Sequence, residues 1–207
     1  MMIKENLSEL SSTLPNNVTL VAVSKFHPIE AIQEAYDSGI RDFGESRVQE
    51  LLIKQAKLPS DIRWHFIGHL QTNKVKQILP FVYLIQSVDS VHLMETIERE
   101  AAKLDRIINI LLEVHVAKDV TKSGFLPNEL NTLPAFPHIR VMGIMGMATL
   151  TDDETEISRC FKELRTIRDK MHLPILSMGM SDDYRIALRE GSTMVRIGST
   201  IFGPRQY

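Results

Sequence analysis

The sequence of 207 residues contains a single cysteine, Cys160. One cysteine cannot form an internal disulfide, and without a Cys-x-x-Cys pair the chain lacks both a dithiol redox motif and a thiolate zinc site. This cysteine usage is typical of proteins in a reducing compartment. The sequence therefore predicts a cytoplasmic protein with no metal site.

Long apolar runs and a dominant charge are also missing. No stretch of about 18 apolar residues occurs, which excludes a membrane-spanning helix. Lys4 and Glu5 interrupt the first residues, so the sequence does not begin like a secretory signal. The 24 Lys and Arg against 26 Asp and Glu leave a formal charge of -2, too little positive charge to hold a polyanion. We expect neither a membrane nor nucleic acid as partner.

Short β-branched apolar runs alternate with longer amphipathic stretches, which is typical of βα units around a parallel sheet. Strands are predicted at 18–25, 42–44, 63–67, 82–86, 107–116, 140–145, 174–178 and 193–197. Helices are predicted between them, with room for only a short one at 127–137. No Gly-x-Gly-x-x-Gly follows any strand, so an open dinucleotide-binding sheet is the second choice. The sequence predicts an α/β fold, a TIM-type (β/α)8 barrel forming a single domain over residues 1–207.

Lys25 ends the first predicted strand on the same face as Val21 and Val23. An ammonium group at the inner end of an apolar strand is costly unless it is paired or used in chemistry. One interpretation is a lysine that extends its charge to water at the strand end. The other is a desolvated amine that forms a Schiff base with a carbonyl compound.

The loops after the seventh and eighth strands contain glycine and hydroxyl residues: Gly179 and Ser181 in the first loop, and Gly198, Ser199 and Thr200 in the second. These are the two loops with which parallel barrels commonly hold a phosphate. Small residues that merely pack a tight turn are the alternative for each loop alone. Because both loops match, a phosphate site is favoured.

Arg196 lies on the eighth strand, which closes the barrel beside the first, so an inward-pointing Arg196 is predicted to lie close to Lys25. A buried arginine needs an acceptor, either a ligand atom or a carboxylate such as Glu113. A lysine, an arginine and a phosphate site together describe a pocket for a phosphorylated aldehyde. Pyridoxal 5'-phosphate (PLP) is the cofactor with that chemistry.

Several other polar residues carry weaker signals. His65 and His69 lie four residues apart on a strand that runs into a loop, so we expect a hydrogen-bonded barrel histidine, not a metal pair. Methionines, Met178 among them, crowd the last strand ends as adaptable filler beside a ligand. Lys122 is expected to be a solvated loop lysine.

Five sequence motifs resemble the pyridoxal phosphate homeostasis protein family. They are VAVSK at 21–25, FGESRVQE at 43–50, WHFIGHLQTNK at 64–74, LSMGMSDD at 176–183 and MVRIGSTIFG at 194–203. The motifs occur in order over nearly the whole chain. The resemblance implies the fold of the N-terminal barrel of alanine racemase, PLP fold type III, here without the C-terminal β domain.

The resemblance also implies a role for each site residue. Lys25 would carry PLP as a Schiff base, and Arg196 would face the pyridine nitrogen. The phosphate would be held by Ser181, Gly198 and Ser199, with further cofactor contacts from Ser46 and Met178. Family members usually carry Asn where this chain has Ser46, and the shorter side chain could reach the ring only through a water molecule.

Two functional hypotheses from different classes follow. In the first, the protein binds PLP reversibly, limits reactive aldehyde in vitamin B6 homeostasis, affects amino-acid and keto-acid metabolism indirectly, and has no catalytic residues. In the second, it is a PLP-dependent amino-acid racemase. A Schiff-base aldolase acting on a sugar phosphate is a third, weaker alternative.

The position of the last residue, Tyr207, favours the first hypothesis. Alanine racemases bring a catalytic tyrosine from the C-terminal β domain of a dimer, whereas this sequence ends at Tyr207. Losing one proton-transfer partner lowers a rate by about 10²- to 10⁴-fold. We therefore expect a monomeric PLP carrier with weak racemase activity at most, whose partners beyond PLP would be PLP-dependent apo-enzymes.

Overall fold

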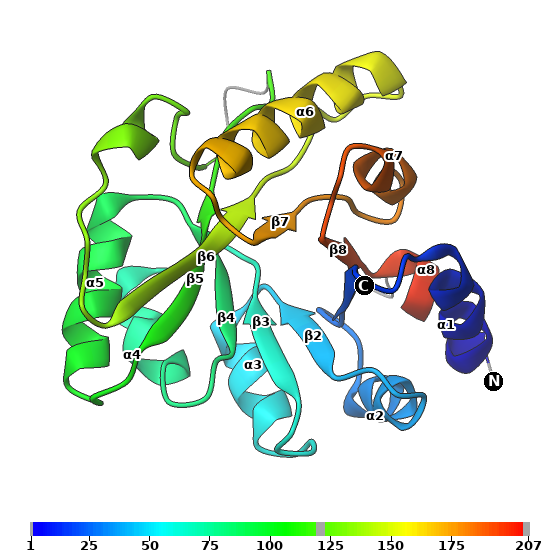
Figure 1. Cartoon of the computed structure of the whole chain (residues 1–207). Coiled ribbons are helices and arrows are strands. Elements are labelled where there is room, and N and C mark those ends of the chain that lie inside the picture. The colour runs from blue at the N-terminus through cyan, green and yellow to red at the C-terminus, as the bar shows by residue number, and fades with distance from the viewer. Residues whose placement is uncertain (1, 119–122, 205–207) are drawn as a thin grey trace.

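The computed structural model describes residues 2–118 and 123–204, and in these ranges eight parallel strands close into a barrel (Figure 1). The strands follow chain order around the barrel: β1 Thr19–Val23, β2 Asp42–Glu45, β3 Arg63–Phe66, β4 Leu84–Val88, β5 Ile108–Glu113, β6 Ile139–Met145, β7 Ile175–Ser177 and β8 Met194–Ile197. β8 pairs with β1, and Arg196 lies opposite Val21. The predicted TIM-type barrel is confirmed.

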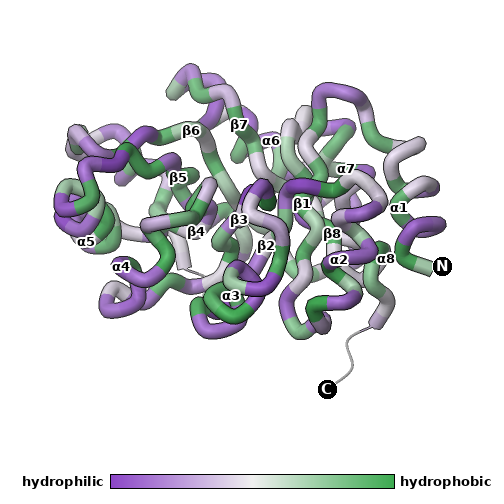
Figure 2. Tube along the Cα trace, turned by 90° about the horizontal axis from the view of Figure 1, so that it is seen from below, coloured by the Kyte–Doolittle hydropathy of each residue, from purple (hydrophilic) through white to green (hydrophobic). Residues whose placement is uncertain are grey.

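Helices follow the strands and cover the outer wall: α2 Ile29–Asp37, α3 Val48–Gln55, α4 Val75–Ile78, α5 Val91–Ala102, α6 Glu154–Lys170 and α7 Tyr184–Arg189, with 3-10 turns η1 Thr72–Lys74 and η2 Glu129–Thr132. Hydrophilic and hydrophobic segments alternate along α3 and α5 (Figure 2), as expected of helices with one face on a barrel. Within the described ranges, no helix has the length and apolar character needed to cross a bilayer.

Two helices were not predicted from the sequence. α1 Met2–Thr13 precedes the barrel, and α8 Ser199–Phe202 follows β8; they contact each other although they lie at opposite ends of the chain (Figure 1). The side-chain amide of Asn6 donates a hydrogen bond of 3.0 Å to the Ile201 carbonyl. The first helix therefore braces the loop that follows β8.

β4 begins two residues later than predicted. The apolar run opens at Phe81 and Val82, but their amides still donate to the carbonyl of Ile78, so these residues belong to the turn that ends α4. Ladder pairing starts with the Tyr83 amide, which donates to the Trp64 carbonyl. Hydrophobicity alone does not separate a buried turn from a buried strand.

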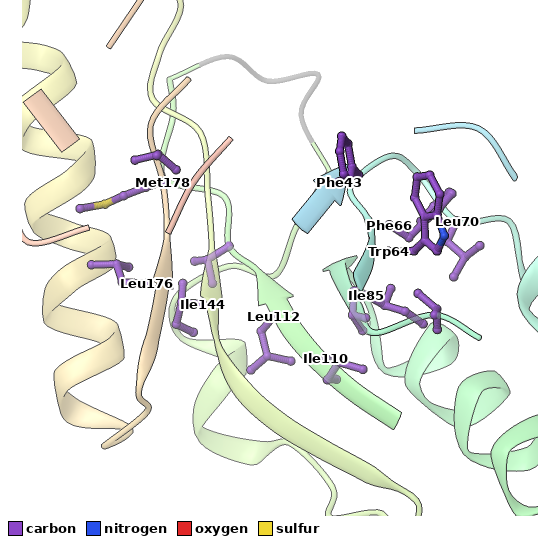
Figure 3. Close-up of a cluster of buried hydrophobic side chains, with 14 of the residues drawn as sticks. Phe43, Trp64, Phe66, Leu70, Ile85, Ile110, Leu112, Ile144, Leu176 and Met178 are labelled. Carbon is purple, nitrogen blue, oxygen red and sulfur yellow. The ribbon is translucent and has the colours of Figure 1, made fainter. Parts of the chain in front are cut away.

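Apolar side chains form two separate layers. The larger one lies between the strands and the helices and includes the side chains drawn in Figure 3. The smaller one fills the inside of the barrel and consists of Val21, Leu84, Leu111, Met145 and Met194. Because side chains alternate across each strand, the remaining inward positions carry polar groups. The inside of the barrel is therefore only partly apolar.

Candidate functional site

A cavity of about 260 Å³ opens at the carboxyl ends of β1, β2 and β8. Six of the residues predicted to form the site line it: Lys25, Ser46, Ser181, Arg196, Gly198 and Ser199. Its volume is just under the lower end of usual ligand pockets, about 300 Å³, which suits a single-ring ligand. In parallel barrels this end of the strands carries the functional groups.

A tight turn fixes the direction in which Lys25 leaves β1. Phe26 adopts a left-handed conformation with φ 67°. Its amide donates to Glu50 Oε2 at 3.0 Å, and the amide of His27 donates back to the Ser24 carbonyl at 3.1 Å. A bulky residue at positive φ is strained, so these bonds must hold the turn in place. Half-buried Lys25 is thereby directed toward the cavity.

A buried ion pair supports this turn from the side of the helices. Lys54 Nζ on α3 donates to Glu45 Oε1 at 2.7 Å and to the Ser24 carbonyl at 2.9 Å. The Ser24 hydroxyl also donates to Glu45 Oε1 at 2.6 Å. Burial raises the pKa of the Glu45 carboxyl above its ordinary value, although Lys54 acts in the opposite direction. The cluster anchors the end of β1 to β2 and α3.

Arg196 points into the barrel, with 5% of the residue exposed. Its guanidinium donates to the carbonyl and hydroxyl oxygens of Ser177 at 2.8 and 2.7 Å and to the Gly146 carbonyl at 3.0 Å. Burial lowers its pKa to about 10, so the group remains charged at neutral pH. Among the described residues no carboxylate lies within ion-pair distance of Arg196, and Glu113 is therefore not its acceptor.

The two loops predicted to hold a phosphate both reach the cavity. Gly179 has φ 96°, and a Cβ there would meet the Ala187 Cβ at 2.6 Å, so the turn that presents Ser181 requires glycine. On the other side α8 begins at Ser199, with Gly198 before it. Amides in the first turn of a helix have no intrahelical acceptor and suit an anion together with hydroxyl donors. Thr200, in contrast, does not line the cavity.

The structure does not place Met178 at the cavity. Met178 is fully buried in the outer layer with Leu176 (Figure 3). The cause is the alternation of side chains at the end of β7: Ser177 points into the barrel, so its neighbours point away from it. Met147 and Met180 are the methionines that line the cavity, which places the predicted methionine filler on other loops.

The remaining sequence predictions have mixed outcomes. His65 is fully buried and hydrogen-bonded to Asp42 and Gln86, so the predicted barrel histidine is confirmed, whereas His69 is exposed. Lys122 lies outside the described residues. His27 and Asp182 line the cavity without having been predicted. His27 follows Lys25 by two residues, and this closeness in the sequence could have predicted that His27 lines the cavity.

A closed parallel barrel that carries a lysine at the end of its first strand and an arginine on its last strand has the architecture of an alanine racemase-like barrel. The family model "Alanine racemase, N-terminal domain" matches residues 2–206. A solved alanine racemase of Clostridium difficile superposes with a TM-score of 0.81 at 14% identity, covering 100% of this chain and 57% of that one. This likeness shows the fold.

Closer relatives define the family. The chain is 40% identical over 203 residues to the pyridoxal phosphate homeostasis protein of Aquifex aeolicus, covering 93% of this chain and 89% of the relative. PipY of Synechococcus elongatus, solved with PLP bound, superposes with a TM-score of 0.90 at 39% identity and covers 97% of this chain and 100% of PipY. The chain belongs to the pyridoxal phosphate homeostasis protein family.

Proposed function

We propose that this protein binds PLP reversibly in the cavity beside Lys25 and acts in vitamin B6 homeostasis. The observation that carries the proposal is the convergence of Lys25, Arg196 and two loops with glycine and serine residues on one cavity of suitable size. The name of the Aquifex relative and the PLP-bound structure of PipY support the same assignment.

The residues present fit the parts of PLP one by one. When bound, PLP supplies an aldehyde that reacts with amines and a ring that accepts electrons. Lys25 would offer the amine that holds the aldehyde end covalently. Ser181, Gly198 and Ser199 offer hydroxyl and amide donors to the phosphate, and Arg196 offers N–H donors to the ring nitrogen. Because a cationic guanidinium can donate but not accept a hydrogen bond, Arg196 would favour the unprotonated form of that nitrogen.

A carrier role is favoured over a racemase by the groups around Lys25. Racemisation needs a second base opposite the first. Apart from Lys25, the titratable side chains that line the cavity with it are His27, Asp182 and the permanently charged Arg196, and no tyrosine lines it among the described residues. We propose that the protein works as a cytoplasmic monomer, passes PLP to apo-enzymes, and affects amino-acid and keto-acid pools only through the cofactor supply.

The decisive experiment measures the absorbance of the purified protein with added PLP. We expect a new band that borohydride bleaches, and mass spectrometry of the reduced protein should place the adduct on Lys25. Lys25→Ala should abolish both signals, whereas Lys103→Ala, which removes an exposed lysine on the far wall, should leave them unchanged. A wild-type protein whose spectrum does not respond to PLP contradicts the proposal.

Incubation of the PLP-loaded protein with L- and D-amino acids separates the two candidate functions. For a carrier we expect no sustained racemisation. Turnover near that of ordinary enzymes, about 10 s⁻¹, would support the racemase instead. A measurement of His27→Ala in the same assay would then show whether His27 is the second base.

A further inference from the structure

A chain of hydrogen bonds crosses the inside of the barrel from Arg196 to the opposite end. Arg196 Nη1 lies 2.7 Å from Ser177 Oγ, which lies 2.7 Å from Gln86 Oε1. Gln86 Nε2 lies 2.9 Å from His65 Nδ1, and His65 Nε2 lies 2.9 Å from Asp42 Oδ1. Because β7 and β4 are not neighbours in the barrel, the bond between Ser177 and Gln86 spans its interior.

The members of this chain are shut off from water. Ser177, Gln86 and His65 are 0% exposed, and the apolar side chains of the inner layer surround them. A buried polar group without a partner costs about 1 to 3 kcal/mol, so each link depends on the next. Neither Gln86 nor His65 lines the cavity that holds Lys25.

The two ends of the chain, Arg196 and Asp42, together determine the direction of every hydrogen bond in it. An arginine can only donate, so Ser177 Oγ accepts from Arg196. An ionised carboxylate can only accept, so His65 donates from Nε2 to Asp42, and the Ser177 hydrogen is directed at Gln86 Oε1. The Gln86 oxygen is thereby occupied, and its amide nitrogen donates to Nδ1 of His65. Nδ1 accepts only in the tautomer with the proton on Nε2, which donates to Asp42.

The position of Arg196 also depends on the other members of the chain. Two of its three acceptors are backbone carbonyls, whose positions the strands fix, and the third is the Ser177 hydroxyl. Without Gln86 as acceptor, the Ser177 hydroxyl loses the partner that fixes its rotation, and its lone pair is no longer held toward the guanidinium. Gln86 therefore keeps a lone pair of Ser177 directed at Arg196.

We propose that Gln86 and His65 are positioning residues which, through Ser177, hold the guanidinium of Arg196 at the cavity. Only the identity of the ligand that Arg196 contacts rests on the proposed function. The hydrogen-bond chain exists in the protein without cofactor, so the positioning role can be tested on the cofactor-free protein.

The first test uses nuclear magnetic resonance on the ¹⁵N-labelled protein without PLP. We expect the His65 ring in the Nε2–H tautomer and slowly exchanging Nη hydrogens on Arg196. Gln86→Leu should speed that exchange by about ten-fold or more, because one hydrogen bond of the guanidinium is lost. Asn109→Ala is the matched control, since Asn109 lines the same lower cavity as His65 but is not in the chain. A proton on Nδ1 of His65, or unchanged exchange in Gln86→Leu, would overturn the proposal.

If Gln86→Leu fails to fold, a pair of substitutions at His65 tests the same proposal. Glutamine can accept and donate in the same sense as the Nε2–H imidazole, so His65→Gln should preserve slow exchange at Arg196. His65→Leu removes both functions and should lose it. If both variants lose the protection equally, the position requires only the shape of the ring, and the positioning role is wrong.

The third test adds PLP. Gln86→Leu should keep the borohydride-sensitive band, but its maximum and pH response should move toward those of Arg196→Ala, and the apparent Kd for PLP should rise about five-fold. An unchanged band and affinity would overturn the proposal. If the wild type takes up no PLP, the proposed function fails, while the exchange rates at Arg196 still decide whether the chain positions that residue.

Discussion

The two ends of the barrel differ in how their buried charged side chains are paired. At the amino end, in a cavity of about 190 Å³, Asp42 accepts from Arg63 at 2.8 Å and from His65 at 2.9 Å, so charge is balanced within the strands. At the carboxyl end, Arg196 is held by carbonyls and a hydroxyl and by no carboxylate among the described residues. The amino end is internally neutralised, and the carboxyl end keeps its positive charge for a ligand.

This contrast follows from what builds each end. Side chains of regular strands form the amino-end cluster, and strand pairing fixes their separations, with Asp42 opposite Arg63 in the ladder. Loops with glycine and serine form the carboxyl end and contribute backbone donors. A fixed set of paired charges stabilises the fold, whereas loops can present donors to an anion.

Removing Asp42 should have the largest effect on stability. Burial alone would raise the pKa of this carboxyl, but the hydrogen bonds from Arg63 and His65 lower it to about 2. Asp42→Ala leaves the fully buried His65 without its acceptor, and we expect a loss of about 4 kcal/mol in urea unfolding. Asp61→Ala, at an exposed pair with Arg41, should change the stability far less, because water screens an exposed ion pair.

The covalent uptake of PLP should survive in Asp42→Ala, because Lys25 lies at the other end. Equal losses of stability in Asp42→Ala and Asp61→Ala would contradict the assignment of structural charge pairing to the amino end.

At the carboxyl end, Glu113 should make stability depend on pH. Burial raises its pKa to about 7 from an ordinary value of 4.5, and the Ser123 hydroxyl at 3.2 Å only partly opposes this. The folded state then binds the proton more tightly than the unfolded state, so the stabilisation is complete below about pH 4.5 and is lost as pH rises through about 7. The difference amounts to about 3 kcal/mol.

Glu113→Gln should remove this dependence, so that at pH 8 the cofactor-free variant has a higher free energy of unfolding than the cofactor-free wild type. Denaturant titrations of the two proteins across this range measure the effect. Parallel pH profiles would show that Glu113 is ionised at little cost and that its end of the barrel is more polar than the structure implies.

A change in the phosphate loop should affect binding more than stability. A Cβ at Gly198 would lie 3.1 Å from the Val23 carbonyl, so Gly198→Ala must displace the start of α8 by a few tenths of an ångström. We expect PLP to bind about ten-fold more weakly, because one charge-assisted hydrogen bond is weakened. Thr200→Ala, two residues further on in α8 and outside the cavity lining, should bind as the wild type does. Equal affinities of all three proteins would place the phosphate elsewhere.

The sequence predicted the carboxyl end better than the amino end. Lys25, Arg196 and the two loops stand out because a charged or glycine-rich group interrupts an apolar strand, and the order of strands places them together. Met178, which the family resemblance implied as a cofactor contact, does not line the cavity, because the alternation of side chains along β7 turns it into the outer layer. The chain from Asp42 to Arg196 was not visible, since each member looks like an ordinary residue on a different strand and only the closed barrel brings them into contact.

The smallest expected effect concerns Ser46, which lines the carboxyl-end cavity and for which the family resemblance implies asparagine as the usual residue. A serine hydroxyl reaches less far than an asparagine amide, so Ser46→Asn should replace a contact through water by a direct hydrogen bond and tighten PLP binding about three-fold. Fluorescence titration with PLP measures the change, and Ser11→Asn on the exposed face of α1 is the control. A weaker affinity would indicate that the cavity is shaped around the smaller side chain, and that its ligand-facing wall is as rigid as the charge pairs at the amino end.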